Sequence, residues 1–147
     1  MRQNEQIELL KKELAILNEA GKILARSYQR CQEIGVKKDY TLEEQDHFEG
    51  LTSRFARLSD ILIQKIFRLI EILDLPGTIR DRVNRAEKKG LIASANTFAN
   101  IRDLRNNISH EYTPSHIHEI YTQVIEWTPD LLETIKNVEK YCKKYHD

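Results

Sequence analysis

Residues 101–116, IRDLRNNISHEYTPSH, contain three side chains that could act together on a phosphate group: Arg105, His110 and Tyr112. Arginine presents a planar set of N–H donors that matches phosphate oxygens. Histidine titrates near neutral pH, so it can accept or donate a proton. Metal-free cleavage of RNA needs a proton acceptor for the 2′-hydroxyl group and a cation that stabilises the charged phosphorane. These residue types are therefore candidates for phosphodiester chemistry, and a symmetric dimer would supply two of each group.

Ordinary structural roles also fit these residues. Arg105 stands in an otherwise apolar stripe, because helical residues seven apart return to nearly the same face. The other members of the stripe are Phe98, Ile101, Ile108 and Tyr112. A guanidinium is costly to bury unpaired, so Arg105 could pair with an acidic residue on another helix. His110 could be a solvated residue whose charge suits a helix C-terminus. Spacing alone leaves both interpretations open.

Three nearby polar residues bear on the same site. Asn106 lies four residues before His110, a spacing at which its amide could hold the imidazole ring. His116 and His118 begin the last expected helix and could approach the site. Residues two apart face opposite sides of a helix, so these two histidines are not expected to share a metal ion. We expect neither a metal nor a cofactor.

A second polar group lies on the expected second helix. Arg54, Arg57 and Asp60 follow one another at one-turn spacing. Such residues usually form a solvated or ion-paired face. The alternative is that these three residues line a groove for RNA.

Apolar periodicity predicts the helices that must position these residues. In the first segment the steps alternate between three and four residues, which is typical of one buried helix face. Gly21 lies in this stripe and could let a neighbouring helix approach closely. The stripe consists of Ile7, Leu10, Leu14, Leu17, Gly21, Leu24, Tyr28 and Cys31.

The second helix is expected to be long, over residues 42–73. Thr41 followed by Glu44 has the spacing of a capping box, which predicts the start. One apolar stripe runs along Leu51, Phe55, Leu58, Leu62, Ile66, Leu69 and Leu73, and a parallel set of Ile63, Phe67 and Ile70 widens it. A helix that is apolar on more than one side must bury two faces. One face can pack in its own bundle, and the other suggests a subunit interface.

Two further helices precede the candidate site or contain it. Proline and glycine in DLPGT, residues 74–78, end the long helix. A short charged helix over about residues 79–90 should follow and close at Gly90. Ser94 could cap a fourth helix. This helix should end near residues 112–113, because the residue before Pro114 is pushed out of the α region.

The last helix is expected from about Ser115 to about Lys144. Pro129 interrupts it, and Thr128 could cap a new start, so a kink is expected. The sequence contains no strand pattern, repeat or low-complexity tract. It predicts one domain, residues 1–147, folded as an all-α, antiparallel up-and-down helical bundle with four main helices and one short helix.

Composition narrows the class of protein further. The 147 residues carry 23 Lys and Arg against 23 Asp and Glu, so the formal net charge is zero. This balance argues against a broad nonspecific nucleic-acid surface but allows a small phosphate pocket. Cys31 and Cys142 lie far apart and have no metal-binding spacing. The polar N-terminus and the lack of a long apolar run predict a cytoplasmic protein without a signal peptide or membrane span.

The stretch RNNISHEY resembles the core motif of the HEPN superfamily, an arginine and a polar residue followed by a histidine. The added His-x-Tyr, giving Arg-x4-His-x-Tyr, is similar to the HepT-like branch. Asn106 fits the polar residue of that motif, and LTSRFARLSDILIQKIFRLIEIL resembles the long second helix of these proteins. The resemblance covers most of the chain. It implies a HEPN-like helical bundle.

The resemblance also implies a function. Many HEPN proteins are metal-independent endoribonucleases that act as homodimers, with arginine and histidine pairs meeting across the dimer. HepT-like members are toxins of toxin–antitoxin pairs, neutralised when a cognate MNT-type nucleotidyltransferase transfers AMP to the motif tyrosine. By position, catalysis would fall on Arg105 and His110, support on Asn106 and AMPylation on Tyr112. The alternative is a non-catalytic substrate-binding or partner subunit of a nucleotidyltransferase. A third possibility is a purely structural helical dimer whose match to the motif is accidental.

Overall fold

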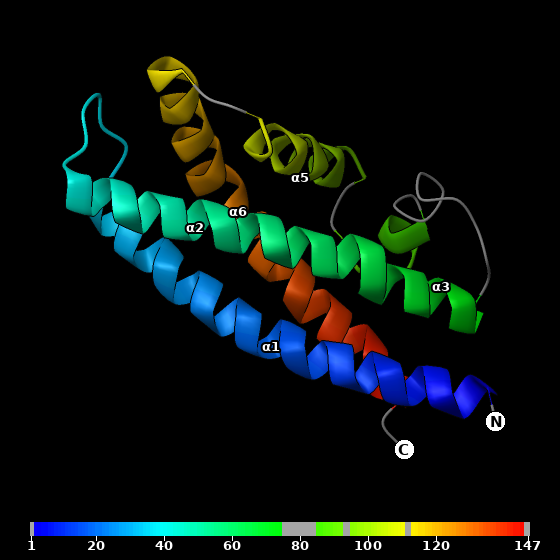
Figure 1. The fold of residues 1–147 in the computed structure, drawn as a ribbon. Helices are drawn as coiled ribbons and strands as arrows, with labels where there is room; N and C mark the ends of the chain where they lie inside the picture. The colour runs from blue at the N-terminus through cyan, green and yellow to red at the C-terminus, as the bar shows by residue number, and fades with distance from the viewer. Residues whose placement is uncertain (1, 75–84, 93–94, 111–112, 146–147) are drawn as a thin grey trace.

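Helices dominate the chain in a computed structural model of the protein, which describes residues 2–74, 85–92, 95–110 and 113–145 (Figure 1). No strand occurs in these residues. The main elements are α1 (Arg2–Ile34), α2 (Leu42–Asp60), η1 (Ile61–Ile66), α3 (Phe67–Asp74), α5 (Ala95–Ile108), α6 (Pro114–Cys142) and η2 (Lys143–Tyr145). α1 runs in one direction, and the rod formed by α2, η1 and α3 returns beside it. The predicted all-α helical bundle is confirmed.

The apolar stripe of α1 is buried, as its spacing predicts. Leu10, Leu17 and Leu24 have no exposed surface. The helices α2 and α6 both contact α1. Gly21 permits the close approach that the sequence suggests, because a Cβ atom added there would lie 3.0 Å from the Cδ1 atom of Ile135 on α6. A larger side chain at Gly21 would therefore crowd the terminal methyl group of Ile135, which would have to move.

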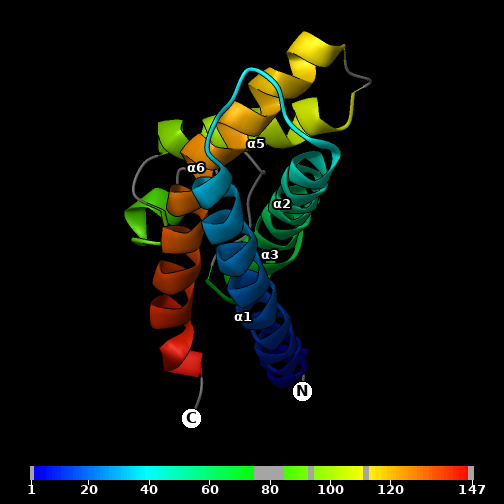
Figure 2. The ribbon, with the colours of Figure 1, turned by 90° about the vertical axis from the view of Figure 1, so that its left-hand side faces the viewer.

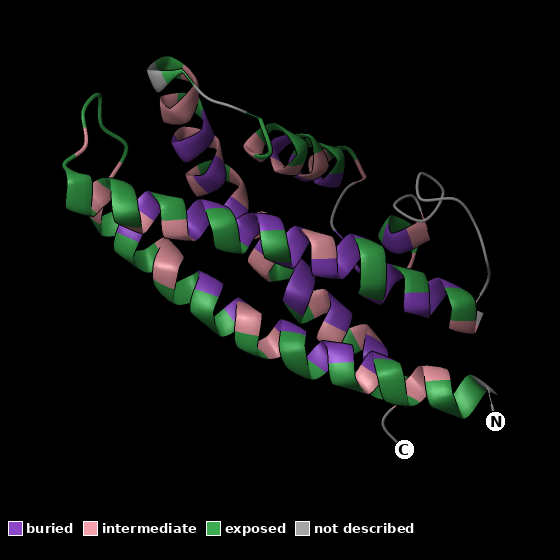
Figure 3. Cartoon of the chain, in the orientation of Figure 1, coloured by how far each residue is buried: buried purple, intermediate pink, exposed green. Residues whose placement is uncertain are grey.

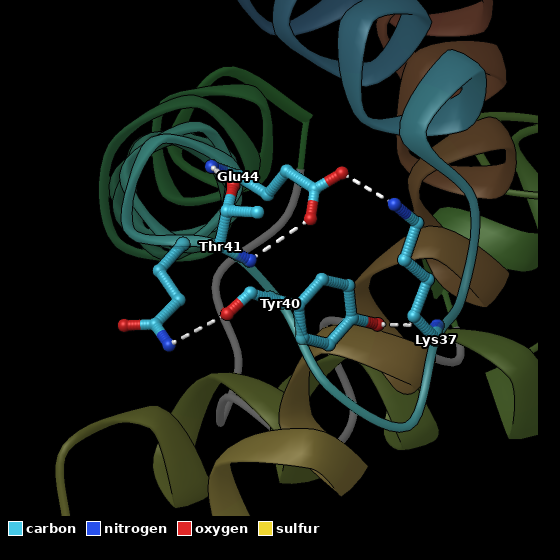
Figure 4. Close-up of polar contacts among 5 residues, drawn as sticks. Lys37, Tyr40, Thr41 and Glu44 are labelled. Atoms are coloured by element: carbon cyan, nitrogen blue, oxygen red, sulfur yellow. Dashed lines mark hydrogen bonds and ion pairs between the residues drawn. The ribbon is translucent and has the colours of Figure 1, made fainter.

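α2 begins at the predicted capping box (Figure 4). The hydroxyl oxygen of Thr41 accepts a hydrogen bond from the backbone N–H of Glu44 at 3.1 Å. The Glu44 carboxylate accepts one in return from the backbone N–H of Thr41 at 2.9 Å. Lys37 pairs with the same carboxylate at 2.5 Å. The Lys37 ammonium and the Thr41 N–H hold the pKa of the Glu44 carboxyl below its usual value, which preserves the cap into acidic solution.

The long second helix contains a π-helical segment that the sequence pattern does not predict. η1 spans six residues, and at its end the backbone N–H of Phe67 donates to the carbonyl of Leu62, five residues back. The wider π turn changes the angular phase of every later side chain. Both apolar stripes consequently face this chain's own core: Leu62 is 0% exposed on one stripe, and Phe67 is 1% exposed on the other.

The subunit interface expected on this helix stays a prediction, but the apolar set that suggested it is buried within the single chain. Ile63, Phe67 and Ile70 form the second apolar set, and they are 9%, 1% and 1% exposed in the single chain. The chain itself fills that face. Figure 3 shows many exposed positions along α1. Among the described residues, apolar side chains left exposed in a regular row lie on this helix, where Leu9 and Ile16 are 46% and 43% exposed.

The segment after α3 ends as predicted at Gly90. Residues 85–88 are helical, and Gly90 has a φ of 77°. Two backbone hydrogen bonds across this end have the pattern of a Schellman motif. Arg85 Nε donates to both carboxylate oxygens of Glu71 at 2.8 and 2.9 Å, which ties the segment to α3. Residues 79–84 of the predicted short helix lie outside the described residues. So does Ser94, the predicted cap of the next helix.

α6 begins at Pro114 with Thr113 as its N-cap. Pro129 lies inside the helix and does not end it. The expected new cap at Thr128 was wrong, because its hydroxyl donates to the Val124 carbonyl one turn back at 2.5 Å and stays within the helix. The two halves of α6 nevertheless run in different directions (Figure 2). A proline explains this bend, because it lacks the N–H of the helical hydrogen bond and its ring crowds the preceding turn.

Candidate functional site

Arg105 of α5 forms a bidentate ion pair with Asp60, the last residue of α2. Its Nε donates to Asp60 Oδ1 and its Nη2 donates to Asp60 Oδ2, both at 2.8 Å. The side chains are 27% and 34% exposed. The paired acid on another helix that the structural interpretation predicts for Arg105 is therefore present. Asp60, considered from the sequence only as part of an RNA groove, is that partner.

Ser109 provides a third contact to the same guanidinium. Its hydroxyl oxygen accepts a hydrogen bond from Arg105 Nη1 at 2.8 Å. Asp60 and Ser109 together engage three of the five N–H donors that a guanidinium carries. The guanidinium plane is consequently fixed before any ligand binds. Ser109 is not among the residues predicted from the sequence, although its spacing of four residues from Arg105 is the signal that could have identified it.

α5 ends at Ile108, earlier than the sequence analysis predicts. The Ser109 and His110 N–H groups donate to the carbonyls three residues back, at 3.2 Å each, so the helix tightens and stops there. The expected end near residues 112–113 was wrong. α6 already begins at Pro114, so the chain must leave α5 early enough to turn into the next helix. His110 is exposed just beyond the helix end.

The supporting residues of the motif are only partly placed. Asn106 is exposed on α5, and within the described part of the chain no hydrogen bond joins its side chain to His110. The expected support of the imidazole ring by Asn106 is therefore absent from this arrangement. Tyr112, the residue expected to be AMPylated, lies outside the described residues.

The three residues considered for an RNA groove spread around α2. They are spaced three apart, so Arg54 and Asp60 point about 120° away from each other around the helix axis. Arg54 faces α1, where its Nη1 donates to Ser27 Oγ at 2.7 Å. Arg57 is exposed between them. Arg54 also lines a broad hollow of about 750 Å³ between α1 and α2, with Arg26, Arg30 and His47 among the other lining residues.

A smaller cavity lies between α2, α5 and α6. Its volume is about 220 Å³, and it is lined by Glu49, Thr52, Ser53, Ala56, Ile108, Ile117, Ile120 and Tyr121. The Tyr121 hydroxyl donates a short hydrogen bond to Glu49. Burial, together with the neighbouring Glu49 carboxylate, raises the pKa of Tyr121 well above its usual value. This cavity was not predicted from the sequence, because its lining residues come from three separated segments.

His118 lines a hollow whose lining residues do not include Arg105. It lines a space of about 340 Å³ beside Tyr40 and Lys38, and its ring lies 6.3 Å from the Tyr40 ring. His116 lies in the first turn of α6, where its backbone N–H donates to Thr113. The described ranges contain no group of three or more His, Cys, Asp or Glu side chains that could hold a metal ion. In the same ranges no helix is both long and apolar enough to cross a membrane.

Comparisons of the chain with models of protein families, with curated proteins and with solved structures found no match.

Proposed function

We propose that the chain is a metal-independent endoribonuclease of the HEPN type. The observation that carries this proposal is the setting of Arg105: its guanidinium is held by Asp60 and Ser109 at the end of α5, and His110 is exposed just after that end. An RNA phosphate that reached this point would meet a preoriented guanidinium, so little side-chain entropy would be lost on binding. The motif RNNISHEY supports the same assignment by its resemblance.

The proposed reaction needs two proton transfers. A neutral histidine removes the proton of the ribose 2′-hydroxyl, whose oxygen then attacks the adjacent phosphorus. The bond from phosphorus to the 5′-oxygen of the next nucleotide breaks, and an acid protonates that oxygen. Arg105 stabilises the charge that develops on the phosphate oxygens. His110 of one chain can serve as the base or as the acid, so we propose a homodimer in which a second copy supplies the other.

Biologically, we propose that this ribonuclease is a toxin neutralised by a cognate MNT-type nucleotidyltransferase. As the antitoxin, this nucleotidyltransferase would transfer AMP to the Tyr112 hydroxyl. The support is the His-x-Tyr element of the motif. A nucleotide attached there would add an anionic phosphate, which would compete with RNA for Arg105. Tyr112→Phe should then remain toxic alone and resist neutralisation. An unmodified Tyr112 after incubation with the nucleotidyltransferase, ATP and magnesium, measured by peptide mass, would contradict this part.

The direct test is cleavage of single-stranded RNA by purified protein in excess EDTA. We expect cleavage by the wild type, and a loss of about 100-fold or more in both Arg105→Ala and His110→Ala. Matched controls are Arg102→Ala, on the same helix one turn earlier, and His47→Ala on α2. Circular dichroism must show that each variant is folded. Dependence on a metal, or full activity in the two site variants, would contradict the mechanism.

A second function is favoured by one feature, the ion pair itself. Because Asp60 neutralises Arg105 within the chain, the arginine also fits a non-catalytic role in a helical partner subunit of a nucleotidyltransferase. This subunit would present a substrate or Tyr112 to the transferase. Expression of the chain alone separates the two functions. Growth arrest that requires His110 supports the ribonuclease, and normal growth with AMP transfer to the chain supports the partner subunit.

A further inference from the structure

The broad hollow between α1 and α2 is lined mainly by positive charge. In the described part of the chain, its charged lining residues are Arg26, Arg30 and Arg54, with Glu33 as the one acid beside them. The chain as a whole has a formal net charge of zero, so this excess is local. A hollow lined by one sign of charge concentrates ions of the opposite sign. Its ligand should therefore be an anion.

These arginines keep more of their charge available than Arg105 does. Arg30 contacts Glu33 at 3.4 Å, between side chains that are 50% and 58% exposed, and exposed pairs of this kind are weak. Arg26 and Arg54 form no ion pair with any described residue. Because a guanidinium stays protonated in proteins, positive charge in the hollow remains open to a ligand.

The guanidinium of Arg54 is held in position at the wall of the hollow. Its Nη1 donates to Ser27 Oγ on α1 at 2.7 Å. Gly50 lies one turn earlier on α2, and a Cβ atom there would lie only 3.1 Å from the same Nη1. The missing side chain at Gly50 thus leaves room for this arrangement. The remaining N–H donors of Arg54 are oriented before a ligand binds, which lowers the entropy lost on binding.

Guanidinium groups from the two helices converge at this wall. Burial raises the pKa of the Cys31 thiol, and the charges of Arg30 on α1 and Arg54 on α2 oppose part of that rise. Both arginines therefore lie near the same thiol, although they are far apart in the sequence. Two neighbouring guanidinium groups suit a ligand with more than one anionic group.

The phosphate groups of a nucleic-acid strand match this chemistry. Each nucleotide of a strand adds one negative charge, and arginine binds phosphate oxygens through paired hydrogen bonds. Ser27 and Gln29, which also line the hollow, are residue types that donate to nucleic-acid backbones. Among the described lining residues there is no Phe, Tyr or Trp on which a base could stack. The contacts would therefore be to the backbone and independent of sequence.

The hollow is connected across α2 to the residues of the proposed reaction. Arg54 lies six residues before Asp60, the partner of Arg105, which is about 9 Å along the helix axis. Arg57 is exposed between them. We propose that this hollow binds backbone phosphates of a nucleic-acid strand beside the segment that reaches Arg105. Phosphate binding stands on the hollow itself, and only the identity of the strand as substrate RNA rests on the ribonuclease function above.

Single-stranded DNA tests the hollow without catalysis, because it lacks the 2′-hydroxyl that the proposed reaction requires. Binding of the full-length protein to a fluorescent oligothymidylate of about ten nucleotides is followed by anisotropy over a range of salt concentrations. We expect a Kd of about 100 μM or lower near physiological salt. Arg26→Gln and Arg54→Gln should each weaken binding about 5-fold at about 0.1 M salt. Each should also reduce the slope of log K against log salt by about 0.7.

Three further variants separate charge from position and from shape. Ser27→Ala should weaken binding about 2- to 10-fold with little change in the salt slope, because Arg54 loses its hydrogen bond but keeps its charge. Arg68→Gln, at an exposed position on α3 outside the hollow, is the matched control for loss of an arginine. His47→Ala is the control for shape, since it lines the hollow without a permanent charge. Both controls should keep the wild-type affinity.

The outcomes distinguish the hollow from the proposed reaction. Wild-type affinity in both Arg26→Gln and Arg54→Gln, or no binding at about 1 mM protein, would overturn the proposal. Equally tight binding of polyglutamate would assign the hollow to an acidic peptide and overturn it as well. DNA binding that requires Arg54, without RNA cleavage by the wild type, would support the hollow and contradict the ribonuclease. RNA cleavage with an unchanged KM in Arg54→Gln, without DNA binding, would do the opposite.

Discussion

Breaking the Arg105–Asp60 pair should destabilise the bundle by an amount that depends on how deeply the pair is buried. Exposed ion pairs contribute about 0.2–1 kcal/mol, whereas removing one partner of a buried pair costs about 3–5 kcal/mol. The two side chains are 27% and 34% exposed, and their contact is bidentate. We therefore expect Asp60→Ala to lower the free energy of unfolding by about 2 kcal/mol. For a chain of this size that corresponds to a fall in Tm of about 4–8 °C.

A double-mutant cycle isolates the pair from the other effects of each substitution. Urea unfolding of Asp60→Ala, Arg105→Ala and the double variant should give a coupling energy of about 1.5 kcal/mol. The Asp60–Arg102 cycle is the control and should give a coupling near zero. More than half of the coupling should survive about 1 M salt, because partly buried pairs are screened less than exposed ones. A coupling no larger than that of the control would refute the reasoning.

Three further predictions concern the scaffold. Thr41→Ala removes the α2 cap and should cost about 1 kcal/mol in urea unfolding; no change would mean that Glu44 alone holds the helix end. Gly21→Val should lower stability by about 1–3 kcal/mol, because its side chain would crowd that of Ile135, and unchanged stability would show that the Ile135 side chain can move aside. Burial raises the pKa of the Cys31 thiol from 9.0 to about 11. The folded state therefore binds more protons than the unfolded state in this window, and stability should fall as pH rises from about 9 to 11. Urea unfolding of the wild type and of Cys31→Ala, repeated across this pH window, measures the contribution of the thiol. If the free energy of unfolding varies with pH in the same way for both proteins, the contribution is absent.

Local sequence signals were sufficient wherever the determining contacts are close in the chain. Thr41 and Glu44 define the start of α2, because a capping box needs only residues three apart. Gly90 ends its segment because glycine adopts a positive φ readily. The stripe containing Leu10 and Leu17 is buried because helical spacing puts its members on one face.

These local signals could not predict contacts between segments that are distant in the sequence. The partner of Arg105 could have been any exposed acid on another helix, and Asp60 is identified only once α2 and α5 are packed together. The π turn that follows Asp60 leaves no residue signature in the apolar pattern, yet it decides which side chains face the core. The end of α5 depends on where α6 must start, so local pattern extended that helix too far.

In the proposed ribonuclease, the pairing with Asp60 would limit what Arg105 contributes to binding RNA. Two opposite charges in contact attract a distant polyanion weakly, since their fields largely cancel at distances much longer than their separation. Salt screens the remainder beyond the Debye length of about 8–10 Å. Arg105 would therefore act at short range, through oriented hydrogen bonds in the transition state. Long-range attraction would have to come from cations without such an anionic partner in contact, and the exposed Arg57 is placed for this between the ion pair and the hollow lined by Arg54. The two roles separate in kinetics: substitution of Arg57 would change KM and its salt dependence, and substitution of Arg105 would change kcat.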